Sequence, residues 1–283
     1  MEIANLIKEL RNKTGAGFLD CKTALSENNN NIDDAVEYLR KKGLAKASKK
    51  TSREANEGAI GFFSNENIAV IIKINSETDF AAKSETFLNF LNELGNLALK
   101  TNDPDLNRDT FLNIDSKYGK ISDYFTNMIS QIGENLILND LLVYNNNGNL
   151  SHYIHNSYTK NIGKIISIIN YKSNKTDEKI KLLSKNLCMH IAAMKPISLD
   201  VNDLDSSIIE NEKTIQRELI LNSGKPSNIV EKILDGKMNK FYSEVTFLNQ
   251  KYVLDQEKNI KQIIKEYSQE YNYSIESFNI ITL

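Results

Sequence analysis

Histidines, cysteines and glycines are the first residues to test for chemistry in this sequence. His152 and His155 are three positions apart on a predicted strand, so they point to different faces and do not suggest a metal site. Cys188 and His190 are two positions apart in a predicted helix, where they diverge by about 200°, so a Cys–His pair is not expected. The glycine-rich segment 15–17 lacks the strand and third glycine of a phosphate-binding loop. No residue set therefore invites a catalytic mechanism.

The tripeptide Thr78-Asp79-Phe80 is more informative than these groups. It lies where the apolar strand 68–74 gives way to a helical pattern that starts after Asp79. Phe80 is therefore predicted to be a large apolar residue in the first turn of a helix, at the edge of a sheet. Such a residue is either a wedge that enters another protein or an ordinary core residue. Asp79 has a second interpretation, as the N-cap of its own helix.

The composition is that of an ordinary globular chain. The 283 residues predict roughly two domains, and a formal net charge of −2 gives no global field toward nucleic acid or membrane. The chain has only two cysteines, Cys21 and Cys188, which argues against a disulfide framework and fits a reducing compartment. No apolar run approaches the ~20 residues of a membrane helix. We expect a soluble, cytoplasmic protein without a membrane partner.

Residues 1–43 are predicted to form three short helices. Their apolar stripes are Ile3, Leu6, Ile7 and Leu10; Phe18, Cys21 and Leu25; and Ile32, Ala35, Val36 and Leu39. Segment 14–17 should end the first helix and Gly43 the third. A bundle this small has a thin core, so we expect an attached binding module and not a site for chemistry.

A basic linker, residues 44–56, follows this module. The basic side chains of segment 41–53 are Lys41, Lys42, Lys46, Lys49, Lys50 and Arg53. Two interpretations stay open: the surface of an RNA- or ribosome-binding adaptor, or a solvated helical linker. No aromatic residues lie between the basic ones, so a surface that stacks single-stranded bases is not predicted.

From Glu57 the pattern alternates between strands and helices, in two cycles that predict two related α+β halves with antiparallel sheets. The first half, 57–134, has strands 59–64 and 68–75 and a helix with Phe87, Leu91, Leu94 and Ala98 on one stripe. The second half, 135–283, has strands 136–144, 150–157 and 162–171, a helix at 177–194, a helix at 257–271 and a final strand at 274–282. The whole pattern predicts the α+β fold class.

A pair of helices without intervening strands interrupts the second half at about 203–245. Ile208, Ile215 and Leu219 are predicted to line the first helix, and Ile229 and Ile233 the second. Such a helical hairpin either projects or packs as an antiparallel coil. We expect that it can support self-association.

Four segments in order resemble signatures of bacterial elongation factor Ts. They are LRNKTGAGFLDCKTAL at 10–25, TDFAAK at 78–83, HIAAMKP at 190–196 and SGKP at 223–226. The resemblance covers nearly the whole chain. It implies a guanine-nucleotide exchange factor that binds the GDP form of elongation factor Tu and promotes exchange for GTP, without covalent chemistry, a cofactor, nucleotide binding of its own or a nucleic-acid partner. It also implies that the three-helix module is similar to ubiquitin-associated domains.

The resemblance assigns the candidate site residue by residue. Thr78, Asp79, Phe80 and Ala81 match the turn that enters the GTPase near its magnesium and phosphate site. In the N-terminal module, three residues match positions that contact the guanine-binding side: Arg11, Phe18 and Leu19. His155 resembles a histidine in the pocket that receives a helix of the GTPase.

The sequence departs from the family pattern in four places. Ala81 stands where a larger aliphatic residue is usual, and Ser84 where Asn or Asp is usual. Phe18 and Leu19 replace a Met pair, which keeps the apolar volume, so we expect that contact to survive. The chain stops at Leu283, where many members continue into a helical module that also contacts the partner. We expect that contact to be missing and the affinity to be lower.

Overall fold

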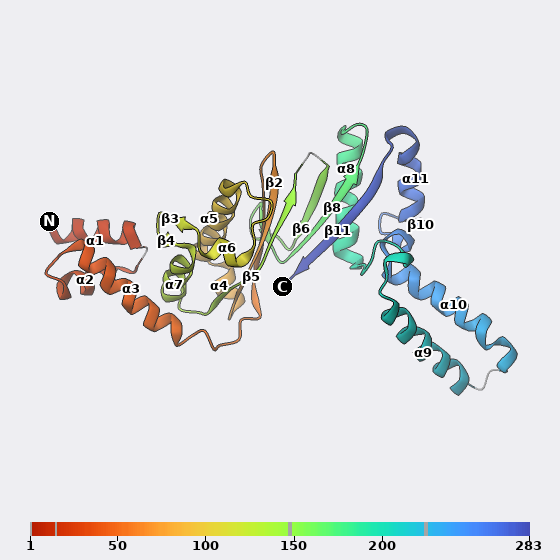
Figure 1. Ribbon diagram of the computed structural model, residues 1–283, viewed down its shortest axis with the longest axis horizontal. Coiled ribbons are helices and arrows are strands. Elements are labelled where there is room, and N and C mark those ends of the chain that lie inside the picture. The colour runs from red at the N-terminus through yellow and green to blue at the C-terminus, as the bar shows by residue number, and fades with distance from the viewer. Residues whose placement is uncertain (1, 15, 147–148, 224–225) are drawn as a thin grey trace. The chain divides into compact units, whose positions relative to one another are not determined.

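The computed structural model describes residues 2–14, 16–146, 149–223 and 226–283. Gly15 of the first signature and Gly224 and Lys225 of the fourth lie outside these ranges. The chain is an α+β protein, in which three N-terminal helices precede antiparallel sheets mixed with helices (Figure 1). It divides into two compact units. One contains residues 1–148, 156–165 and 282–283, and the other contains 149–155 and 166–281.

The N-terminal helices of the first unit are α1 (Glu2–Thr14), α2 (Phe18–Glu27) and α3 (Ile32–Ser48). Their shared core contains the buried side chains of Ile7, Leu10, Cys21, Ala24, Leu25, Ala35 and Leu39. Helix α1 ends at Thr14, as predicted. The Asn31 side chain accepts hydrogen bonds from the backbone N–H groups of Asp33 and Asp34 and so caps α3.

Three predictions for these helices are wrong. Ile3 does not join the buried stripe of α1, since 50% of it is exposed. Helix α3 does not end at Gly43 but continues to Ser48, because Ala47 is buried in the core of the first sheet and this packing outweighs the cost of a mid-helix glycine. Phe18 does not share the buried stripe of Cys21 and Leu25, since 53% of it is exposed.

The first sheet has the strand order β5-β2-β1-β7. Strand β2 pairs antiparallel with β1 on one side, and with β5 on the other from Ile68↔Asn145 to Ser76↔Leu136. The predicted grouping of 136–144 with the strands that follow is therefore wrong, since this segment completes the first sheet. The strands are β1 (Glu57–Ser64), β2 (Ile68–Ser76), β5 (Leu136–Asn145) and β7 (Ile162–Gly163).

Helices cover this sheet and form its core. The helix α5 (Glu85–Thr101) has its predicted stripe buried, as the spacing indicates: Phe87, Leu91, Leu94 and Ala98. The remaining elements are α4 (Asp79–Lys83), α6 (Arg108–Leu112), β3 (Asp115–Ser116), β4 (Gly119–Lys120) and α7 (Ile121–Ile132). Gly58 lets β1 and β2 approach closely, because its φ is +144° and a Cβ there would lie 2.1 Å from the carbonyl oxygen of Ile74.

The second unit is built on a sheet with the order β11-β8-β6, against which α8 packs through β6. The predicted strand 162–171 is wrong as a single element, because it breaks at Lys164 and its two parts, β7 and β8, join different sheets. The predicted helix 257–271 starts late: residues 257–259 complete β10, and Asn259 caps α11. The elements are β6 (Leu150–His155), β8 (Ile165–Lys172), α8 (Glu178–Met194), β9 (Lys251–Tyr252), β10 (Asp255–Asn259), α11 (Ile260–Tyr271) and β11 (Ser274–Thr282).

Helices α9 (Ser206–Asn222) and α10 (Ser227–Val245) form the predicted hairpin and lie side by side (Figure 1). Its seam contains the buried side chains of Ile220, Val230, Leu234 and Met238. The predicted stripe on the first helix is wrong, because Ile208, Ile215 and Leu219 are 40%, 44% and 58% exposed. These three residues follow another face of α9. Within the described ranges, no helix combines the length and apolarity needed to cross a bilayer.

Candidate functional site

The turn between β2 and α4 is short and fixed by local hydrogen bonds. Strand β2 ends at Ser76, whose hydroxyl donates to the carbonyl oxygen of Thr78 at 2.9 Å. Thr78 is the N-cap of α4, since its hydroxyl oxygen accepts from the backbone N–H of Ala81 at 3.2 Å. The interpretation of Asp79 as the N-cap is therefore wrong. Asp79 is the first helical residue, and Phe80 the second.

Phe80 is turned away from the protein. It is 82% exposed, whereas the next two residues, Ala81 and Ala82, are 8% and 0% exposed. Helix α4 therefore directs its two alanines into the unit and its one aromatic ring outward. The interpretation of Phe80 as an ordinary core residue is wrong. A ring this exposed gains apolar burial only when another molecule covers it.

Two glutamates connect the turn with the segment that leads into β5, one from each side. The carboxylate of Glu134, just before β5, accepts from the backbone N–H of Thr78 at 2.9 Å and from its hydroxyl at 2.6 Å. The carboxylate of Glu77 accepts from the backbone N–H of Asn135 at 2.7 Å. The Asn135 side chain in turn donates to the carbonyl oxygen of Arg53 at 2.8 Å. The turn is thus connected to β5 and to the end of the segment that follows α3.

Asp79 carries a negative charge at the exposed side of the turn. The Lys83 ammonium, 2.6 Å from Asp79 Oδ2, lowers the pKa of this carboxyl, and Lys164 contributes to the same shift. The same hydrogen bond raises the pKa of Lys83. Both groups are therefore ionised at neutral pH, and the turn presents an anion beside an aromatic ring.

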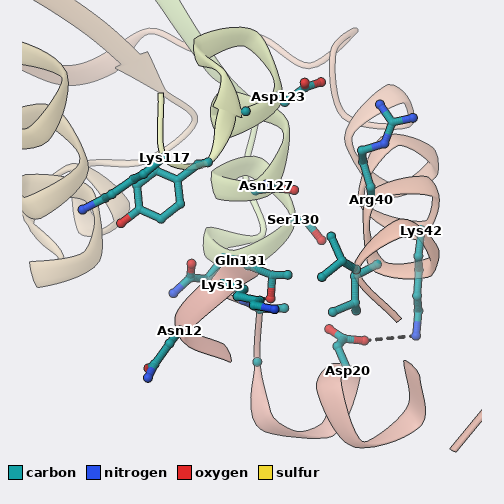
Figure 2. Close-up of a pocket in the computed structure, with 18 of the residues that line it drawn as sticks. Asn12, Lys13, Asp20, Arg40, Lys42, Lys117, Asp123, Asn127, Ser130 and Gln131 are labelled. Carbon is teal, nitrogen blue, oxygen red and sulfur yellow. Dashed lines mark hydrogen bonds and ion pairs between the residues drawn. The ribbon is translucent and has the colours of Figure 1, made fainter. Parts of the chain in front are cut away.

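The contact residues predicted in the N-terminal module are also exposed. Arg11 and Phe18 line a common cavity of about 500 Å³, and 75% of Leu19 is exposed. Figure 2 shows a neighbouring cavity of about 670 Å³ between α1, α2, α3 and α7. Two of the residues that line it, Lys42 and Asp20, form an ion pair at 3.0 Å. The structure thus brings Arg11 and Phe18 together, and the residues of the Phe80 turn line neither cavity.

Comparisons with known proteins identify the family. A family model described as elongation factor TS matches residues 77–283, a range that includes Thr78, Asp79 and Phe80. Over 281 residues the chain is 36% identical to elongation factor Ts of Rhizobium meliloti (strain 1021), covering 99% of this chain and 91% of that protein. The chain belongs to the elongation factor Ts family. Elongation factor Ts of Rickettsia prowazekii (strain Madrid E) is 38% identical over 275 residues, covering 96% of this chain and 88% of that protein.

Elongation factor Ts is the nucleotide exchange factor for EF-Tu in translation elongation, and this chain has that function. The protein is an exchange factor and not an enzyme. The resemblance of the four sequence segments is therefore confirmed. An exchange factor needs exposed groups that a GTPase can bind, and Phe80 is the most exposed of the large apolar residues in the described part of the chain.

His155 ends strand β6 in the second unit. It is exposed, and the Tyr153 hydroxyl lies 3.3 Å from its Nδ1 atom. The other histidine of the strand, His152, is partly buried, and this burial together with the charge of Lys185 lowers its pKa to about 4. Of the two, His155 is the more exposed.

Cys188 and His190 serve the interior of the second unit. Burial raises the pKa of the Cys188 thiol to about 12, and its Sγ donates to the carbonyl oxygen of Ser151 at 3.3 Å. His190 Nε2 donates to Gln250 Oε1 at 3.0 Å, while its Nδ1 accepts from the backbone N–H of Val253 at 3.3 Å. Both ring nitrogens are used, and burial lowers the pKa of His190 to about 4. Among the described residues, no three acidic, His or Cys side chains come together in a way that could hold a metal ion.

Several basic side chains of segment 41–53 are already engaged within the protein. Lys41 lies 3.5 Å from Glu37, and Arg53 lies 3.3 Å from Glu77. The Lys50 ammonium donates to the carbonyl oxygen of Gly133. These contacts favour a structural linker over a free basic surface.

The sequence interpretation did not include Glu77, Glu134 or Asn135 in the site. Glu134 and Thr78 are 56 positions apart, so no local pattern connects them. The one available signal is the order Gly133-Glu134-Asn135, in which a helix stop is followed by polar residues directly before an apolar strand.

Proposed function

We propose that the turn formed by Thr78, Asp79, Phe80 and Ala81 inserts into EF-Tu near its magnesium and phosphate site and promotes GDP release. The observation that carries this proposal is the 82% exposure of Phe80 beside the buried Ala81 and Ala82. The neighbouring glutamate contacts fix the backbone below the ring. An aromatic ring on a fixed turn at the end of a strand suits insertion into another protein.

The physics of exchange explains why such a ring is useful. A GTPase holds GDP through backbone amides, a lysine and a hydrated magnesium ion, so displacement of one contact weakens the others. An exchange factor binds the nucleotide-free GTPase more tightly than the loaded form, and linkage requires that nucleotide weakens the factor by the same ratio. Burial of Phe80 contributes about 1.5–3 kcal/mol only in the inserted state. The equilibrium between nucleotides is unchanged.

The N-terminal helices supply a second contact in this proposal. Arg11, Phe18 and Leu19 bind the guanine-binding side of EF-Tu, in a module similar to ubiquitin-associated domains. The exposure of Phe18 and Leu19, at 53% and 75%, supports this role because neither side chain is used in the module's own core. His155 enters a third contact, with a helix of the GTPase, which its exposure supports.

The proposal also covers the two units, the helical hairpin, the compartment and the partner. The cores of the two units, apart from the N-terminal helices, are related α+β subdomains, since each combines a sheet with packed helices. The hairpin α9–α10 projects from the second and mediates self-association, which the exposed apolar face of α9 supports. The protein acts in the cytoplasm, with EF-Tu as its partner and without nucleic acid. The RNA-binding alternative predicts strongly salt-dependent RNA binding without EF-Tu.

Stopped-flow release of a fluorescent GDP from the cognate EF-Tu tests the proposal. Phe80→Ala should lower the maximal catalysed rate by at least about tenfold, because an interaction made only in the transition state for release is lost. Phe18→Ala should instead raise the factor concentration that gives half the maximal rate, because it removes a uniform binding contact. An unchanged maximal rate for Phe80→Ala would reject the wedge.

A further inference from the structure

We infer that Glu134 and Glu77 are positioning residues for nucleotide exchange, whose carboxylates form a reciprocal clamp that presets the Phe80 turn. The inference rests on the proposed role of Phe80 and adds the residues that act through it.

The clamp begins where backbone pairing stops. Ser76 and Leu136 are the last pair of the β2–β5 ladder. Beyond this pair, the segment after β2 and the segment before β5 each place a glutamate side chain against the backbone of the other. Glu134 accepts from the N–H of Thr78 at 2.9 Å, and Glu77 accepts from the N–H of Asn135 at 2.7 Å. The two carboxylates therefore continue the connection between these segments after the ladder ends, with charge-assisted hydrogen bonds.

A second bond of Glu134 reaches the helix that carries Phe80. The Thr78 hydroxyl donates to Glu134 Oε1 at 2.6 Å, which fixes the hydroxyl hydrogen. An oxygen lone pair of Thr78 is then directed to the backbone N–H of Ala81, at 3.2 Å. Glu134, Thr78 and Ala81 thus form one chain of hydrogen bonds around Phe80. This chain sets the direction in which the first turn of α4 leaves the sheet.

Glu134 is not needed simply to satisfy a buried group. Thr78 is exposed and Glu134 is partly exposed, so water could bond to both if the clamp opened. The effect of the clamp is therefore to limit the conformations of the turn before EF-Tu binds. A preset turn avoids part of the ordering cost when the ring enters the partner.

The same corner fastens the segment that follows α3. The Arg53 guanidinium lies 3.3 Å from Glu77, and the Arg53 carbonyl oxygen accepts from the Asn135 side chain at 2.8 Å. Asn135 is buried, with 2% exposed, so its two donated hydrogen bonds are held away from water. The clamp therefore has a fixed base on the β5 side, against which the Thr78 side is held.

The test is a double-mutant cycle between Glu134→Ala and Phe80→Ala, read as the maximal rate of GDP release from EF-Tu at saturating factor. Glu134→Ala should lower this rate about tenfold in the wild-type background, because misplacement of a group that acts on the transition state costs one to two orders of magnitude. In the Phe80→Ala background the same change should lower it less than about twofold, because coupled residues are not additive.

Two further variants separate positioning from stability. Glu134→Gln keeps an acceptor for the Thr78 N–H, so it should restore the rate to within about threefold of wild type. Glu66→Ala, which removes a glutamate at the opposite end of β2, should leave the rate unchanged. If Glu134→Ala does not fold, Thr78→Val replaces it in the cycle, since it removes the hydroxyl that links Glu134 to the backbone N–H of Ala81.

The outcomes distinguish the two claims. A wild-type rate for Glu134→Ala, or an equal loss in both backgrounds, overturns the clamp while Phe80 keeps its role. A wild-type rate for Phe80→Ala overturns the proposed function, and the clamp's role in exchange falls with it. A loss in the wild-type background that vanishes in the Phe80→Ala background supports the inference.

Discussion

Lys83 lies one helical turn after Asp79 in α4, and its Nζ atom is 2.6 Å from Asp79 Oδ2. The pair is exposed, so water and salt screen it. It lowers the pKa of Asp79 further and directs its carboxylate along the helix toward Lys83. The carboxylate could serve α4 alone or the contact with EF-Tu.

Substitution of each partner decides between these roles. Asp79→Ala should lower the maximal rate of catalysed GDP release about tenfold, because the carboxylate enters the GTPase with the ring. Lys83→Ala should lower it no more than about twofold, since an exposed ion pair contributes little. Stopped-flow rates measure both. Equal losses for the two variants would show that Asp79 acts only through its bond to Lys83.

The buried His190 should make the second unit sensitive to acid. Burial lowers its pKa from the ordinary 6.5 to about 4, so the unfolded state binds more protons between these values. The free energy of unfolding should therefore be constant above pH 6.5 and fall as the pH decreases toward 4. The contribution of His190 to this fall is at most about 3 kcal/mol.

Urea unfolding at a series of pH values measures this dependence. His190→Gln should reduce the slope between pH 6.5 and 4, because the titrating group is gone while a donor and an acceptor remain. His152 should account for a further part, since its pKa is also lowered to about 4. Identical slopes for wild type and His190→Gln would contradict the assignment.

The exposed face of α9 predicts a division of roles within the hairpin. The double substitution Ile215→Ser and Leu219→Ser should abolish the proposed self-association in sedimentation velocity, while GDP release stays within about twofold of wild type, because both side chains lie outside the seam. Leu234→Ala, inside the seam, should instead destabilise the hairpin by about 2–5 kcal/mol. An equal loss of exchange and association in the Ile215 and Leu219 variant would contradict this division.

The sequence predicts elements well where one apolar stripe is available. Helix α5 is an example, since its buried residues follow the helical period. Strands β1 and β2 are predicted well for another reason, since each is a continuous apolar run that is buried at nearly every position. It fails on α9, which has apolar residues on two faces, and only the position of α10 decides that Ile220 and not Leu219 is buried. It also fails at Gly43, because the packing of Ala47 that extends α3 is a tertiary contact.

The candidate site shows the same limit. The order of strand, polar turn and helix places Phe80 at a corner, and the resemblance supplies a role for it. The exposure of Phe80 depends on which face of the short helix α4 packs inward. A sequence with two alanines and one aromatic ring does not decide between these faces. The glutamate clamp depends on the register between β2 and β5. This register is set by the pairing of two strands that are far apart in the sequence.

The position of Phe80 in the complex with EF-Tu is the most direct test of the account. A photoreactive p-benzoylphenylalanine at position 80 should cross-link, in the nucleotide-free complex, to peptides around the magnesium and phosphate site of EF-Tu, as mapped by mass spectrometry. The same probe at Leu182, a 60% exposed position on α8, should give no product there. Formation of the complex with position 80 cross-linking elsewhere, or not at all, would contradict the claim that this ring enters the phosphate site.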